Sequence, residues 1–210
     1  MTGVDVRFRT ASPITASYNW IDFVTQAGYV RFYGVGSTLT AGVTYLLTTT
    51  AVDSGTGDTS GTAGFKTFGV AGADIDIDFD ITFNRPVTIA KADAFVNYTL
   101  WHEANADINS SVVSIKHVDT GASETVIGTA SIEAHTQAPE NYWREALKIA
   151  LTETVFSIGE KLRITITVVN NAANNTAIFH DPTSSLSFTD SESRTIGSDM
   201  TIDIPFKVQT

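Results

Sequence analysis

Residues 74–83, DIDIDFDITF, carry an aspartate at every second position. Carboxylate oxygens are the ligands that calcium prefers, and one ion needs about six to eight oxygens at about 2.3–2.6 Å. Side chains on one face of a strand stand about 6.5–7 Å apart, so adjacent aspartates cannot share an ion without donors from a neighbouring strand. We therefore predict a solvent-facing row opposite a buried row, with a metal site or a charged docking stripe as alternatives. The aspartates are Asp74, Asp76, Asp78 and Asp80, and the buried row is Ile75, Ile77, Phe79 and Ile81.

A second pattern contains the ligand types of non-haem iron oxygenases, which hold their metal with two histidines and one carboxylate. His117 and Asp119 form an H-x-D step, and His180 and Arg194 follow later in the chain. The step runs directly into the turn sequence D-T-G, which places it at an edge and not inside a barrel. The sequence also lacks H-E-x-x-H, G-x-S-x-G and G-x-x-x-x-G-K-[ST] motifs. We predict that these groups do not converge, and that the chain has no catalytic residue, metal or cofactor.

Three aromatic residues at expected strand ends could stack against sugar rings. They are Trp101, Tyr142 and Trp143. Sugar-binding jelly rolls use such platforms, but tryptophans at strand ends also serve in cores and interfaces. We expect Trp101 and Trp143 to be mostly covered, and we keep a carbohydrate-binding module, with surface glycans as partners, as an alternative.

The composition excludes some classes of partner. The 210 residues carry 13 basic and 23 acidic side chains, a net charge of −10. This charge disfavours binding to nucleic acids and to anionic membrane surfaces. There is no cysteine, so the fold uses neither disulfides nor thiolate metal sites. No apolar run approaches the roughly 20 residues of a membrane-spanning helix.

Alternation with a period of two dominates the chain and predicts strands. It is clear in LRITITVV (162–169) and SDMTIDIPFKV (198–208), and in AFVNYTLWHE, SVVSIKHV and ETVIGTASIE. The segment WREALKIALTE (143–153) could form a helix by propensity, but it also alternates, and we predict a long strand within a hairpin. Roughly a dozen strands with hairpin spacing predict an all-β, antiparallel, jelly-roll-like β-sandwich.

A run rich in glycine, serine and threonine (53–64) divides the chain unevenly. We predict that residues 65–210 form the sandwich, and that residues 1–64 form either outer strands of it or an arm that packs on a neighbouring subunit. Aromatic residues at the density of the first segment need burial, and such side chains anchor interfaces. The candidate assembly contacts are Tyr18, Trp20, Phe23, Tyr29, Phe32 and Tyr33.

Three phrases carry a resemblance to a known group of proteins. They are FDITFNRPVTIAKADAFVNYTL (79–100), TETVFSIGEKLRITITV (152–168) and TAIFHDPTSS (176–185). Together they resemble virion structural proteins of tailed bacteriophages, in which two strands joined by a Gly-Glu/Asp-Lys turn precede a strand ending in His-Asp-Pro. The resemblance covers roughly residues 65–190, and residues 1–64 carry none of it.

The last of these phrases also has a physical interpretation. Residues 177–179 finish a strand, Asp181 can accept a hydrogen bond from a following backbone N–H, and Pro182 prevents further pairing. We interpret His180, Asp181 and Pro182 as a structural turn.

The resemblance implies a non-enzymatic protein of the virion, assembled in the host cytoplasm. The expected role is a capsid decoration or stabilising protein whose partners are other copies of itself, with a trimer as the first hypothesis, and the major capsid protein. The alternatives are a tail or baseplate component, the carbohydrate-binding module and, last, the iron oxygenase.

Overall fold

The structure of the chain is a computed structural model that describes ten segments. The predictions for Tyr18, Trp20, Phe23, Asp181 and Pro182 lie outside the described residues. The described residues are 27–40, 42–51, 66–69, 74–102, 107–136, 141–170, 176–180, 187–189, 195–197 and 200–207.

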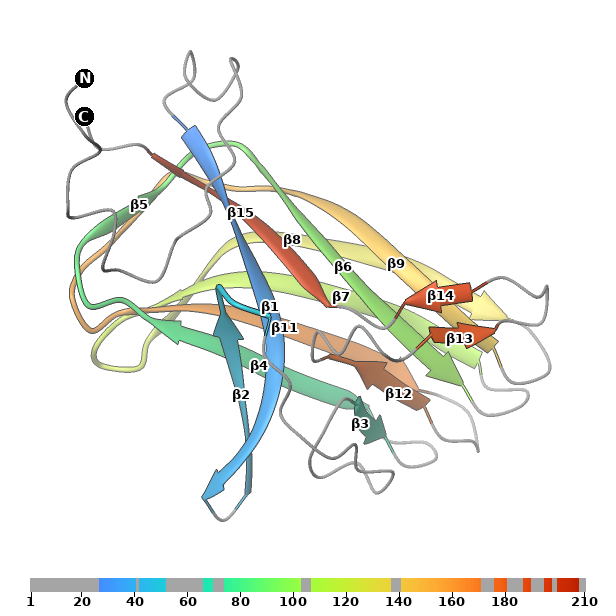
Figure 1. Cartoon of the computed structure of the whole chain (residues 1–210). Helices are drawn as coiled ribbons and strands as arrows, with labels where there is room; N and C mark the ends of the chain where they lie inside the picture. The colour runs from blue at the N-terminus through green and yellow to red at the C-terminus, as the bar shows by residue number, and fades with distance from the viewer. Residues whose placement is uncertain are drawn as a thin grey trace, which may run out of the picture.

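Every regular element in the described residues is a strand (Figure 1). No described segment is a helix of the length and apolarity needed to cross a membrane. The strands are β1 (Ala27–Thr40), β2 (Gly42–Thr48), β3 (Lys66–Gly69), β4 (Ile75–Thr82), β5 (Val87–Ile89), β6 (Asp93–His102), β7 (Asp107–Val118), β8 (Glu124–Thr136), β9 (Asn141–Ala150), β10 (Thr154–Phe156), β11 (Lys161–Asn170), β12 (Thr176–Phe179), β13 (Ser187–Thr189), β14 (Thr195–Gly197) and β15 (Thr201–Lys207).

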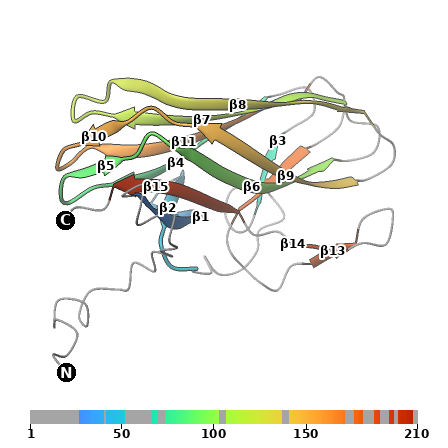
Figure 2. The same ribbon diagram turned by 90° about the horizontal axis from the view of Figure 1, so that it is seen from above.

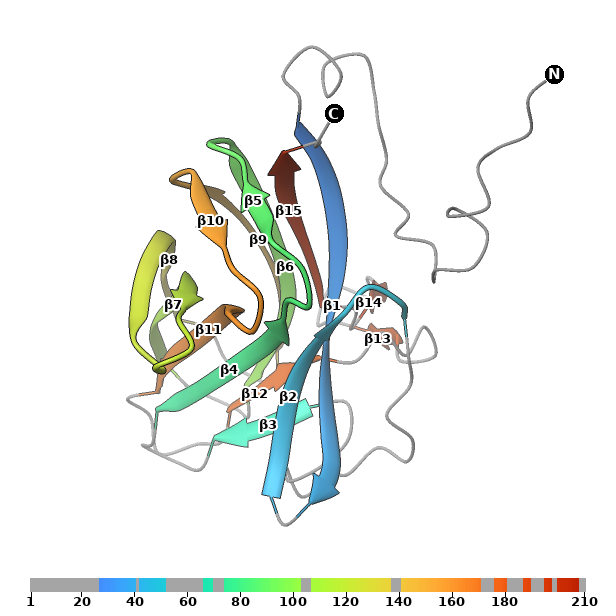
Figure 3. The same cartoon turned by 90° about the vertical axis from the view of Figure 1, so that its left-hand side faces the viewer.

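One large sheet contains all of the described strands except the β13–β14 hairpin. Its main path runs β3-β12-β6-β15-β1-β2-β4-β11-β7-β8, with β9 added to β6, and with β5 and β10 added beside β15. The described pairings are antiparallel except for one parallel bridge between β2 and β4, at Leu46 and Asp80. The sheet folds over on itself, so that β4, β11, β7 and β8 form one layer and β1, β15, β6 and β9 the other (Figures 2 and 3).

The two ends of the folded sheet meet where β8 passes the end of β9. Thr152, just after β9, donates its backbone N–H to the carbonyl of Ile127 at 2.9 Å. Gly128 permits this approach, because a Cβ there would lie 2.9 Å from the Ala150 carbonyl oxygen and 2.6 Å from Leu151 Cδ2. The sheet is therefore almost a barrel, and the predicted all-β, jelly-roll-like sandwich is confirmed.

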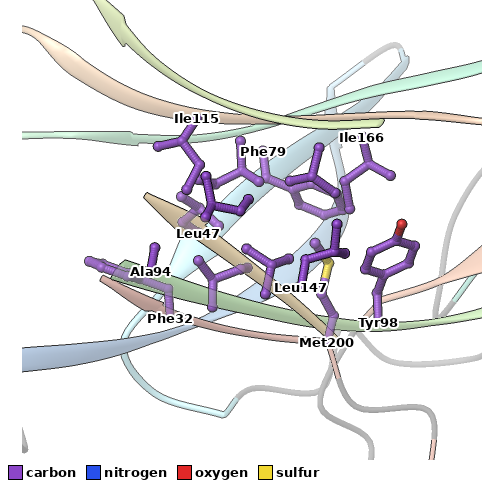
Figure 4. Packing of buried hydrophobic residues seen from close by; sticks show 14 of the residues in the cluster. Phe32, Leu47, Phe79, Ala94, Tyr98, Ile115, Leu147, Ile166 and Met200 are labelled. Carbon is purple, nitrogen blue, oxygen red and sulfur yellow. The ribbon is translucent and has the colours of Figure 1, made fainter. Parts of the chain in front are cut away.

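The core lies between the two layers, and strand alternation fills it. Ile77 and Phe79 of β4 are buried beside Ile166 and Ile164 of β11, with which they are in register. Figure 4 shows side chains from both layers pointing toward one another across this space. Ile81 is only partly buried, so the predicted buried row ends before it.

Two ambiguous parts of the sequence are strands within this sheet. Residues 143–150 belong to β9, so the strand prediction holds and the helical alternative is wrong. The strand ends at Ala150, and it pairs with β6 along its whole length instead of with a neighbour in sequence, so the predicted hairpin is wrong. From the segment 1–64, β1 and β2 lie between β15 and β4 in the main path of the sheet.

Candidate functional site

The outer side of β1 alternates two aromatic rings with one charge. Tyr29, Arg31 and Tyr33 lie on one side of the strand, because successive side chains of a strand point to opposite faces. Val30 and Phe32 lie on the other side and pack in the core, where Phe32 is 2% exposed.

A row of side chains runs across three strands through Arg31. Arg31 is in register with Asp203 of β15, which is in register with Phe95 of β6. Arg31 donates from Nε and Nη2 to the two carboxylate oxygens of Asp203, both at 2.8 Å. Such two-point pairing fixes the plane of the guanidinium group. We call Tyr29, Arg31, Tyr33, Phe95 and Asp203 the aromatic face.

A hollow of about 530 Å³ lies over the aromatic face. This volume falls within the range of about 300–1,000 Å³ that is typical of small-molecule sites. Phe95 is 40% exposed, and its ring centre lies 6.0 Å from that of Tyr29, at an interplanar angle of 43°. The Tyr29 hydroxyl donates to the backbone carbonyl of Asp93 at 2.9 Å, which holds the tyrosine ring in place.

The described charged side chains of the aromatic face are paired, and so is Lys148, which is in register with Phe95. The hydrogen bond to Asp203 raises the pKa of Arg31 above its ordinary value, so its guanidinium remains charged. Lys148 of β9 lies 3.2 Å from Asp93, and both of these side chains are accessible to solvent. The aromatic face therefore offers apolar rings next to polar groups whose charges cancel.

The aspartate row lies on the outer side of the other layer, where Arg163 neutralises part of it. Arg163 donates to both oxygens of Asp80, at 2.7 and 2.8 Å, and lies 3.0 Å from Asp78. It also donates to Glu124 of β8. These partners raise the pKa of Arg163, the hydrogen bond to Asp80 being the first cause.

Threonines of β11 bind the rest of the row. Thr165 donates to Asp78 at 2.6 Å, and Thr167 donates to Asp76 at 3.0 Å. The row points outward as predicted, but only Asp74 and Asp76 are exposed. Asp78 and Asp80 are partly buried, and the Asp80 side chain, paired with Arg163, is 19% exposed. Among the described residues, no group of three or more histidine, aspartate or glutamate side chains is placed to hold a metal ion.

The residues of the H-x-D step have structural partners at the end of β7. His117 Nε2 lies 2.9 Å from Glu160 Oε2, and its ring packs edge-on against Phe156. Asp119 accepts hydrogen bonds from the backbone N–H groups of Gly121 and Ser123, both at 2.8 Å, and so organises the turn.

His180 lies in a different environment, directly after β12. It is 1% exposed, and its ring contacts those of Tyr45 and Phe79 edge-on, at 5.4 and 5.8 Å between centres. The structure therefore gives His117 and His180 separate neighbours, and Arg194 lies outside the described residues.

The two tryptophans do not share one surface. Trp101 of β6 is in register with Tyr142, and Trp143 is in register with Leu100. Neighbouring positions along a strand point to opposite sides, so Trp101 and Trp143 face opposite sides of the layer. Both are partly buried within the chain.

Of the predicted assembly contacts that the structure describes, only two are on the surface. Tyr29 and Tyr33 belong to the aromatic face, whereas Phe32 is part of the core. Sequence reasoning did not select Arg31, Phe95 or Asp203. Alternation in Y-V-R-F-Y could have placed Arg31 beside the tyrosines, but no local signal links it to Asp203, 172 residues away.

Comparison with known proteins shows that this chain shares its fold with part of a solved structure. No protein family and no curated protein sequence matches the chain. A CocE/NonD family hydrolase from Staphylococcus aureus is structurally similar in two crystal structures, with TM-scores of 0.53 and 0.51 and identities of 9% and 11%. These matches cover 83% and 86% of this chain, which spans only 36% of the hydrolase.

Two further structures resemble the chain too weakly to show a shared fold. An α-amino acid ester hydrolase has a TM-score of 0.48 and 11% identity, over 84% of this chain and 36% of its own. TmCBM61, in complex with β-1,4-galactotriose, has a TM-score of 0.30 and 13% identity, over 55% of this chain and 65% of its own.

The hydrolase structures correct the prediction of a non-enzymatic protein. That prediction rested on the absence of catalytic motifs and on the resemblance to virion proteins, and it does not hold because solved structures with this fold are parts of a hydrolase. At 9–11% identity the likeness concerns the fold alone, so no catalytic residue is carried over. The virion role, the trimer, the major capsid protein as partner and the virion location stay predictions.

Proposed function

We propose that this chain binds carbohydrate on the aromatic face of β1, β15 and β6. The observation that carries the proposal is the set of three aromatic residues around the Arg31–Asp203 pair, beneath a hollow of about 530 Å³. A sugar ring has an apolar face of C–H groups and a rim of hydroxyls. Aromatic rings match the first, and a fixed pair of charged hydrogen-bonding groups matches the second.

The exposure of the ion pair favours a sugar over an apolar protein surface. The Arg31 side chain is 55% exposed, so it is solvated in the free protein. An apolar partner would remove this water without replacing its hydrogen bonds, and interface cores are depleted of charged residues for this reason. Sugar hydroxyls replace the water with hydrogen bonds of the same kind.

The proposal also agrees with a hydrolase setting. In the hydrolase structures this fold is only 36% of the chain, so a binding role next to other parts of an enzyme is compatible with it. The fold permits this role, and the aromatic face is the feature that supports it.

The test is binding to a glycan array, followed by titration calorimetry with the best oligosaccharide. Phe95→Ala removes a ring of the aromatic face and should weaken binding at least about tenfold, which corresponds to about 1.4 kcal/mol. Val126→Ala is the matched control, because Val126 is an exposed apolar residue, 54% accessible, on β8 of the other layer. It should bind like the unchanged protein.

Two results would contradict the proposal. One is the absence of binding to any glycan, and the other is a Phe95→Ala variant that binds as tightly as the Val126→Ala variant. Sedimentation velocity of the same variants tests the virion hypothesis. If copies of the chain associate and Phe95→Ala abolishes this association, the aromatic face serves assembly instead.

A further inference from the structure

We infer that the ligand of the aromatic face is an uncharged oligosaccharide, and not a uronate polymer or an amino-sugar polymer. This inference rests on the proposed function and specifies its substrate class. It is drawn from the way in which the charges and hydrogen-bonding groups of the face are already engaged.

The first argument is the balance of charge at the face. Arg31 is compensated by Asp203 at 2.8 Å, and Lys148 is compensated by Asp93 at 3.2 Å. A ligand carboxylate would have to compete with Asp203 for Arg31, and a ligand ammonium group would have to compete with Arg31 for Asp203. Among the described residues of the face, neither ligand charge meets an uncompensated partner, and the net charge of −10 on the chain further disfavours polyanions.

The second argument is the hydrogen-bonding capacity that remains. A guanidinium group has five N–H donors, of which the contacts with Asp203 use two. Each carboxylate oxygen of Asp203 accepts one of these bonds and has a further lone pair. Donors and acceptors therefore stand side by side. A hydroxyl both donates and accepts, so neighbouring sugar hydroxyls can use both kinds of group at once, which a carboxylate or an ammonium group cannot.

The experiment compares three probes of equal length by titration calorimetry: a neutral hexose oligosaccharide, an oligogalacturonate and a chitosan oligomer. We expect the neutral probe to bind most tightly. Its dissociation constant should change less than about twofold between ionic strengths of about 0.01 and 1 M, because no net charge is there to be screened.

Two variants test whether the compensation of Arg31 by Asp203 causes the preference for a neutral ligand. Asp203→Asn leaves Arg31 uncompensated, and it should increase the affinity for the oligogalacturonate at least about fivefold, the effect of one unit charge at about 4 Å in water. Asp76→Asn makes the same change in net charge on the other layer, and it should not increase that affinity. Thermal unfolding of both variants checks that they are folded.

The outcomes separate the inference from the function on which it rests. Tighter binding of either charged probe by the unchanged protein, lost in Phe95→Ala, would overturn the neutral ligand while the proposed carbohydrate binding stands. An equal increase in affinity for the oligogalacturonate in Asp203→Asn and Asp76→Asn would also overturn the neutral-ligand inference. The Arg31–Asp203 pair would then not determine specificity. If none of the three probes binds and the glycan array shows no binding, both the neutral-ligand inference and the proposed carbohydrate binding are wrong.

Discussion

Tyr98 carries a hydroxyl group across the core from one layer to the other. It extends from β6 to Ser111 of β7, where the two hydroxyls form a hydrogen bond. Both residues are buried, with exposures of 0% and 1%. Burial raises the pKa of Tyr98, so its hydroxyl stays protonated. The pair thus satisfies two polar groups that no water reaches and ties the two layers together.

Replacement of Tyr98 by phenylalanine should destabilise the fold by about 1–3 kcal/mol, because it leaves the buried Ser111 hydroxyl without its partner. Urea unfolding measures this loss. Adding Ser111→Ala to Tyr98→Phe should recover part of it, since removing both polar groups costs less than isolating one. A double variant less stable than Tyr98→Phe by the full cost of Ser111→Ala alone would show that the two residues are not coupled.

Glu160 ties the turn before β11 to the end of β7. Its Oε2 accepts the backbone N–H of Ser157 at 2.6 Å and lies 2.9 Å from His117 Nε2. These contacts, the Ser157 N–H first and His117 second, lower the pKa of Glu160 below its ordinary value of 4.5. Because the folded state favours the ionised carboxylate, this contribution to stability is complete above the ordinary value. It is lost as the pH falls through the lower folded value.

We therefore expect Glu160→Gln to be less stable than the unchanged protein near neutral pH. The difference should narrow as the pH falls below the ordinary value of 4.5 and through the lower pKa that the carboxylate has in the folded state. Urea unfolding midpoints of both proteins across this pH range measure the effect. A difference that is the same at every pH would mean that the ionised carboxylate contributes nothing beyond its shape.

At the level of elements, the closure of the sheet depends on the approach of β8 to the end of β9. The site of this approach is Gly128, next to Ile127, which accepts the Thr152 N–H. A Cβ added at position 128 would lie close to the backbone carbonyl oxygen of Ala150. This oxygen cannot rotate away, whereas the end of a flexible side chain can.

Gly128→Ala should consequently destabilise the protein by about 1–3 kcal/mol, the usual cost of overpacking. Amide hydrogen exchange should accelerate at Thr152, whose N–H bond to Ile127 spans the junction. Ser131→Ala, at an exposed position of the same strand, is the control and should change stability by less than about 0.5 kcal/mol. Unchanged exchange at Thr152 in Gly128→Ala would show that the junction tolerates a methyl group.

The strands themselves could be predicted from sequence, because alternation records which side of each strand is buried. Ile75, Ile77 and Phe79 of β4 and Ile164 and Ile166 of β11 follow this rule, since all five are buried. The partnership between distant strands could not be predicted, since nothing local in β1 indicates that β15 is its neighbour. The engagement of the aspartate row was missed for the same reason: Arg163 reaches Asp80 only because β11 pairs with β4 in this register.

At the scale of the whole molecule, the candidate site exists only when distant parts of the chain meet. The aromatic face takes residues from β1, β6 and β15, and its central pair is 172 residues apart. The sequence suggested a platform of Trp101, Tyr142 and Trp143 as an alternative, but the β6–β9 register places Trp101 and Trp143 on opposite sides. It also led to the expectation of a non-enzymatic protein, whereas the assembled sandwich is shared with part of a hydrolase.

The pairing of β1 with β15 also has a consequence for synthesis on the ribosome. Residues 27–33 of β1 pair with residues 201–207 of β15. At roughly 5–20 residues per second, the 172 residues between Arg31 and Asp203 take roughly 9–34 s to translate. Throughout that interval β1 lacks the strand that covers its edge, and an uncovered edge pairs readily with other chains. The nascent protein thus passes through a period of exposure to aggregation that ends only when β15 has emerged.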